Sequence, residues 1–160
     1  MQKIFIFSIL LNLLFVISCK EDTIIPVCLP ATEQMAIDAV AIDNYLSENE
    51  ISASIDPSGL RYLILAEGTG EKPSNTDGVL VKYKGMLLSN GSVFDQNSEG
   101  IQLPLTGVIN GWRIGIPFIK EGGKILLYIP SILGYGCRGT SSKIPGNANL
   151  IFEVELISVL

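Results

Sequence analysis

The side chains of this 160-residue chain that could do chemistry are mostly aromatic and aliphatic, and histidine is absent. Without histidine, the chain cannot build a His-dependent catalytic triad, a histidine general base or a His-containing zinc site. The three cysteines, Cys19, Cys28 and Cys137, form no Cys-x-x-Cys pair. We therefore expect no metal and no cofactor, and reactions that depend on histidine are excluded.

Three segments combine aromatic residues, glycines and a few polar side chains. The first is residues 81–85 (VKYKG), continued by residues 90–95 (NGSVFD). The second is residues 108–112 (VINGW), and the third runs from residues 129–136 (IPSILGYG) to residues 144–156. Together they resemble, in order and spacing, the FKBP family of prolyl isomerases, the immunophilins that bind macrolides such as rapamycin. The resemblance covers roughly residues 59–160.

The resemblance implies a pocket for a proline ring, with the indole of Trp112 as its floor. The catalytic set that it implies is Tyr83, Phe94, Asp95, Trp112, Tyr135 and Phe152, and the substrate-binding set is Val108, Ile109, Ile144, Ile101 and Leu103. In the family, ligands accept hydrogen bonds from the equivalents of the Tyr135 hydroxyl and the Ile109 backbone N–H. The chain departs from the family where aromatic residues are common, at Ile101 and Leu103, and where an acidic residue is common, at Ile132. The loop at residues 140–143 is polar and short of apolar wall.

Such a pocket suits the rotation of an X–Pro peptide bond. The barrier to rotation about an X–Pro bond, roughly 18–20 kcal/mol, is the loss of amide resonance. The planar amide carries charge separation that water stabilises, and the twisted transition state carries less. An apolar pocket that removes water therefore favours the twisted state, which is differential binding of the transition state.

Other interpretations of the same residues remain open. Taken singly, the aromatic residues are typical of a hydrophobic core. The chain could also be a binding module with this fold that holds partners without useful catalysis, or a structural envelope lipoprotein with an incidental pocket. As an enzyme, it would act on proline-containing polypeptides, and macrolides would be possible ligands.

The N-terminal residues indicate export. An apolar run at residues 4–17 follows Lys3 and ends in Val16-Ile17-Ser18-Cys19, which resembles a bacterial lipobox. This predicts a signal peptide at residues 1–18 and lipid on Cys19; an ordinary signal peptide or a buried strand are the alternatives. Without residues 1–18 the chain has 10 basic against 16 acidic residues, a formal charge of −6. This acidity argues against nucleic-acid binding, so we expect a cell-envelope protein that contacts the membrane only through its lipid.

The remaining pattern predicts an α+β fold, an antiparallel sheet wrapped around one short helix with an N-terminal helical extension. Residues 19–31 are expected to be a lipidated tether, residues 32–58 a helix and turn, and residues 59–160 the isomerase domain. The expected helix at 32–49 has Thr32 as its N-cap and buries Met35, Ala39, Ile42 and Leu46. Strands are expected at 60–65, 78–88, 124–129 and 150–160, with a hairpin turn at Asn90-Gly91 and the short helix at 112–118.

Two cysteines remain once Cys19 is assigned to lipid. Cys28 lies in the tether, and Cys137 lies just beyond Tyr135. An even number of cysteines in an oxidising compartment is typical of a disulfide, so Cys28 and Cys137 are a possible pair. Two reduced thiols are the alternative.

Overall fold

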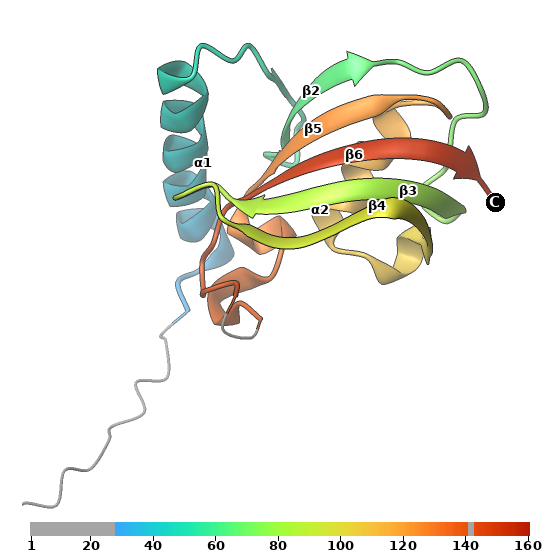
Figure 1. The fold of residues 1–160 in the computed structure, drawn as a ribbon. Coiled ribbons are helices and arrows are strands. Elements are labelled where there is room, and N and C mark those ends of the chain that lie inside the picture. The colour runs from blue at the N-terminus through green and yellow to red at the C-terminus, as the bar shows by residue number, and fades with distance from the viewer. Residues whose placement is uncertain (1–27, 141–142) are drawn as a thin grey trace, which may run out of the picture.

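The computed structural model describes residues 28–140 and 143–160 (Figure 1). The predicted signal peptide and the predicted lipid site at Cys19 lie outside the described residues. The described chain forms one six-stranded antiparallel sheet in the order β1-β2-β5-β6-β3-β4. The strands are β1 (Ser54–Ile55), β2 (Arg61–Ala66), β3 (Gly78–Leu87), β4 (Val93–Pro104), β5 (Lys124–Ile129) and β6 (Leu150–Val159). The α+β prediction is confirmed.

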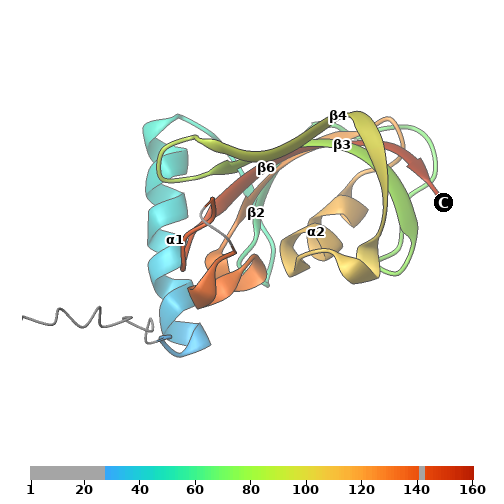
Figure 2. The same cartoon turned by 60° about the horizontal axis from the view of Figure 1, so that its bottom comes forward.

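The sheet curves around a short helix, α2 (Asn110–Gly115), as Figure 2 shows. Along β3, side chains on the concave face alternate with side chains that face solvent, because successive residues of a strand point to opposite faces. Val79 and Val81 are fully buried, whereas Lys82 is half-buried and Lys84 exposed. The concave side chains and α2 form the main core, which includes Leu60, Leu105, Trp112, Ile125, Leu127, Phe152 and Val154.

Two glycines let α2 lie close against β5. A Cβ atom at Gly111 would lie 2.6 Å from Cγ2 of Ile129, and one at Gly115 would lie 2.5 Å from Cδ2 of Leu127. Both distances are far below van der Waals contact, so a larger residue fits only if the helix or the facing side chain shifts. Trp112 lies on the same helix, so this close approach also sets how near its indole lies to the sheet.

The predicted single helix at 112–118 is wrong in both its start and its continuity. The α-helix begins at Asn110 and ends at Gly115, and Ile116–Phe118 continue it as one 3₁₀ turn. Pro117 explains the change, because proline has no N–H for an i→i−4 hydrogen bond. Three further 3₁₀ turns are η1 (Leu105–Gly107), η3 (Ser131–Leu133) and η4 (Gly136–Arg138).

The N-terminal helix, α1 (Ala31–Glu48), stands at one end of the sheet (Figure 1). It packs against strand side chains that point away from α2. Its Ile42 and Leu46 form a second cluster with Tyr128 of β5, Ile151 of β6 and Leu88. These strand residues alternate with the concave ones, so the sheet is covered on both faces at this end. Among the described residues, no helix is long and apolar enough to cross a membrane.

The details of α1 correct two predictions. Thr32 is not the N-cap: the helix begins at Ala31, after Pro30 in an extended conformation, and no side chain caps it. Ile42 and Leu46 are buried as predicted, but Met35 and Ala39 are only half-buried. Gln34 and Asp38 take the buried positions instead, because their polar groups find hydrogen-bond partners there.

We predict that Gly115→Ala lowers the free energy of unfolding by about 1–3 kcal/mol, the usual cost of overpacking a core. Gly107→Ala is the matched control, because a Cβ atom there meets only Pro104 Cγ at 3.4 Å. Urea denaturation of both variants checks this. Equal stability of the two variants would contradict the close contact between α2 and β5.

Candidate functional site

A cavity of about 260 Å³ opens on the concave side, between α2 and the sheet. Its volume is near the lower end for small-molecule sites, so it suits one ring-sized group and not a large cofactor. Aromatic and aliphatic side chains make most of its wall. The lining residues are Tyr83, Asp95, Leu103, Gly107, Val108, Ile109, Trp112, Tyr135 and Phe152.

Edge-to-face contacts between aromatic rings fix the floor of the cavity. The ring of Trp112 lies 5.1 Å from that of Tyr83, with 79° between their planes, and 5.1 Å from that of Phe152, at 83°. Behind Phe152, the ring of Phe94 packs at 5.4 Å and 82°. Aromatic pairs prefer this geometry, since the positive edge of one ring meets the negative face of the other. Trp112 is only 4% exposed.

The structure brings eight of the eleven predicted pocket residues around this cavity. The other three do not line it. Phe94 and Ile144 are buried in the core, and Ile101 is half-buried against that core. Gly107 is a lining residue that sequence reasoning missed. Its place beside Val108 was the only signal, because a glycine has no side chain to suggest a role.

Two tyrosines and one carboxylate supply the polar groups of the cavity. The hydroxyl of Tyr83 donates a hydrogen bond to Oδ2 of Asp95 at 2.6 Å. Burial, together with this bond and the Asp95 charge, raises the pKa of Tyr83 to about 12. Burial, followed by the same charge, also raises the pKa of Tyr135. Both hydroxyls therefore stay protonated near neutral pH and remain donors.

Ile109 directly precedes α2 and is one of the residues that line the cavity. Its carbonyl accepts from the N–H groups of Trp112 and Arg113, at 3.0 and 3.2 Å, which starts the helix. In the described part of the chain, neither the N–H of Ile109 nor the hydroxyl of Tyr135 has a hydrogen-bond partner. The cavity thus offers two donors beside apolar walls. Its described residues include no group of three His, Cys, Asp or Glu side chains placed to hold a metal ion.

A family model described as FKBP-type peptidyl-prolyl cis-trans isomerase matches residues 69–157, more than half of the chain. The chain belongs to the FKBP family. The matched residues include every lining residue of the cavity, from Tyr83 to Phe152.

Relatives and solved structures agree with this assignment. The FKBP chain is 40% identical over 120 residues to the probable FKBP-type peptidyl-prolyl cis-trans isomerase FkpA of Neisseria meningitidis, covering 72% of this chain and 44% of that protein. A peptidyl-prolyl cis-trans isomerase from Pseudomonas syringae pv. tomato superimposes with a TM-score of 0.70 at 29% identity, covering 83% of this chain and 98% of the other. FkpA from Escherichia coli gives 0.68 at 36%, covering 80% and 63%. The chain spans less than half the length of the first curated relatives that it matches.

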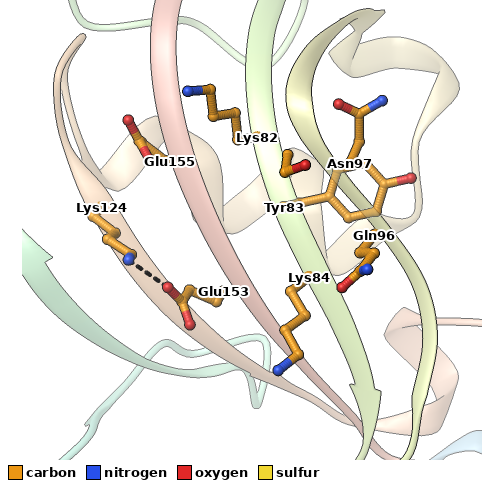
Figure 3. A pocket seen from close by; sticks show the side chains of 9 residues that line it. Lys82, Tyr83, Lys84, Gln96, Asn97, Lys124, Glu153 and Glu155 are labelled. Atoms are coloured by element: carbon orange, nitrogen blue, oxygen red, sulfur yellow. Dashed lines mark ion pairs between the residues drawn. The ribbon is translucent and has the colours of Figure 1, made fainter.

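The other face of this FKBP sheet holds a hollow of different character (Figure 3). Lys82 and Lys84 of β3 lie beside Glu153 and Glu155 of β6, and Lys124 of β5 forms an ion pair with Glu153. Charged walls of this kind keep water in place and do not suit a proline ring. Compared with this charged hollow, the apolar cavity is the better candidate active site of this FKBP protein.

A disulfide joins the N-terminal segment to the loop beside the cavity. Cys28 and Cys137 are bonded, with their Cα atoms 5.5 Å apart across 109 residues of chain. This spacing is usual for a disulfide. The reduced-thiol alternative therefore does not describe this structure.

The raised pKa of Tyr83 makes a titration prediction. Because the pKa of Tyr83 is above its ordinary value of 10.0, Tyr83 contributes stability that is fully present below pH 10 and is lost as the pH rises to about 12. The difference in tyrosinate absorbance between the native protein and Tyr83→Phe should show one group ionising near pH 12. Asp95→Asn should lower this pKa part of the way, since burial remains. Asp43→Asn, a carboxylate bonded to Arg61 instead, should leave it unchanged, and equal shifts in both variants would contradict the assignment.

Proposed function

We propose that this FKBP protein accelerates cis–trans rotation of X–Pro bonds in polypeptides of the bacterial cell envelope. The observation that carries the proposal is the apolar cavity with two free donors at its wall, the Tyr135 hydroxyl and the Ile109 N–H. Residues 59–160 would form the isomerase domain, and residues 32–58 would attach to it as a helix and turn. The family assignment and the relatives named as isomerases support this function.

In the proposed complex, the proline ring lies on the indole of Trp112 between Tyr83 and Phe152. The carbonyl of the residue before proline accepts a hydrogen bond from one of the two donors. Aliphatic walls from Leu103, Val108 and Ile109 exclude water from the amide. Since the planar amide loses its hydration there and the twisted amide needs less of it, the barrier to rotation falls.

The three predicted residues outside the lining act through their neighbours in this proposal. Phe94 supports the ring of Phe152 from behind, so it would hold one wall in place without touching substrate. Ile101 and Ile144 would fill the core around the cavity. Asp95, which accepts from Tyr83, would orient that phenol.

We predict that the oxidised protein accelerates isomerisation of a proline peptide in a protease-coupled assay. Tyr135→Phe should lower kcat/KM by about three- to tenfold, the effect of losing one hydrogen bond.

Phe94→Leu should also lower kcat/KM, because it removes the ring that supports Phe152 in the cavity wall. Phe118→Leu is its control, because Phe118 packs on Tyr62 away from the cavity. A macrolide that places one ring in the cavity should compete with the peptide. A folded protein that leaves the rate at its uncatalysed value, yet binds the peptide, would favour a binding module instead.

The proposal also places the protein in the envelope through lipid on Cys19. The apolar run that ends in Val16-Ile17-Ser18-Cys19 supports this. Cys28 is already bonded to Cys137, which leaves Cys19 as the one cysteine available for lipid. Membrane contact would then come through the lipid chain.

We predict that Cys19→Ser abolishes metabolic labelling of the protein by a radioactive fatty acid. The variant should also leave the membrane fraction or keep its signal peptide, as its mass on a gel would report. Cys28→Ser is the matched control and should still be labelled. If Cys19→Ser is processed and fractionates like the wild type, the lipid proposal is wrong.

A further inference from the structure

The loop that carries Tyr135 begins at a fully buried serine. Ser131 opens η3 directly after β5, and its backbone N–H and its hydroxyl both donate to Oδ2 of Asp38, at 2.8 and 2.7 Å. The same N–H also lies 3.1 Å from Oδ1 of Asn149. Tyr135 follows four residues later and lines the cavity. The start of this loop is therefore bound to a carboxylate of another element.

Asp38 lies on the buried face of α1 and is only 1% exposed. Its second oxygen, Oδ1, accepts from Nε2 of Gln34 at 2.8 Å. A buried carboxylate is costly unless its oxygens are hydrogen-bonded, and bonds to a charged acceptor are among the stronger ones. Moving Ser131 would leave this carboxylate short of donors, so the contact resists displacement of the loop.

A second attachment lies on the other side of Tyr135. The disulfide from Cys28 reaches Cys137, two residues beyond Tyr135. Cys28 and Asp38 belong to the same N-terminal segment, before and within α1. The segment therefore holds the loop at both ends, covalently at one and through buried hydrogen bonds at the other.

Tyr135 depends on these attachments because it has few of its own. The residue is 38% exposed, and within the described chain its hydroxyl has no hydrogen-bond partner. The position of that hydroxyl is thus set by the backbone of residues 131–137. Figure 2 shows α1 alongside this orange loop, with α2 and the concave face beyond it.

We propose that Asp38 is a positioning residue of the prolyl-binding pocket, which together with the Cys28–Cys137 disulfide holds Tyr135 where it can donate to a substrate carbonyl. The inference rests on the proposed function. It makes the N-terminal segment a working part of the site and not only a spacer. Reduction of the disulfide then loosens one of two attachments and weakens substrate binding without abolishing it.

The first test compares two carboxylates on one helix. Asp38→Ala should raise KM for a proline peptide by about three- to tenfold, the range for one misplaced hydrogen bond, with little change in kcat. Asp43→Ala is the matched control: it removes the bonds from α1 to Arg61 of β2 and should leave KM as in the wild type. Ser131→Ala, which keeps the N–H bond to Asp38, is a milder second variant should Asp38→Ala fold poorly. Equal changes in KM for Asp38→Ala and Asp43→Ala would overturn the proposal.

The second test separates positioning from stability. In a Tyr135→Phe background, Asp38→Ala should have almost no further effect on kcat/KM, because the hydroxyl that it positions is gone. Additive effects of the two substitutions would overturn the proposal. A thiol reductant should raise KM of the wild type and not that of the Cys28→Ser/Cys137→Ser variant, which already has the raised value.

The third measurement does not depend on catalysis. Amide hydrogen exchange at residues 131–137 should become faster in Asp38→Ala and on reduction, but not in Asp43→Ala. If exchange is faster in Asp38→Ala but the wild type shows no isomerase activity, the attachment of the loop to α1 is upheld and the proposed function is rejected. Unchanged exchange at these residues would reject the attachment even if the enzyme is active.

Discussion

The close contact between α2 and β5 is the constraint on which the site depends. Gly111 and Gly115 let the helix lie against Ile129 and Leu127, and this contact brings Trp112 edge-on between Tyr83 and Phe152. The floor of the cavity is thus part of the main core, with the indole almost fully buried. A floor of this kind resists displacement, since close-packed interiors have low compressibility.

The pocket keeps water away from a bound amide and holds no group poised for proton transfer. The proposed bond rotation needs no proton transfer, and the ionisable groups of the cavity are held in one protonation state near neutral pH. Asp95 is bound to the Tyr83 hydroxyl, and burial keeps Tyr83 and Tyr135 protonated. The polar groups can orient an amide, while the aliphatic and aromatic walls keep water from it. The absence of histidine from the chain costs such a site nothing.

The sheet is used on both faces, for different purposes. Its concave face carries the cavity and most of the core. The opposite face is covered by α1 at one end, over Tyr128 and Ile151, and is lined with lysines and glutamates further along (Figure 3). The buried contact from Asp38 to Ser131 runs from this covered end to the loop of Tyr135. An element packed on one face thus reaches the site on the other through a single loop.

The sequence by itself determined the fold class and most strands, and its resemblance to the FKBP family implied eight of the cavity's nine lining residues. Alternation along β3, the hairpin turn at Asn90-Gly91 and the three spaced segments are local signals, readable without coordinates. Only the tertiary structure decided the rest. No strand was predicted at β4, because its polar stretch at residues 95–99 is stabilised by pairing with β3 and not by an apolar pattern. Phe94, Ile101 and Ile144 look like wall residues in the sequence, but packing places them outside the lining. Apolar periodicity favoured Met35 and Ala39 as the buried side of α1, whereas Asp38 is buried because Ser131, 93 residues away, supplies its donors.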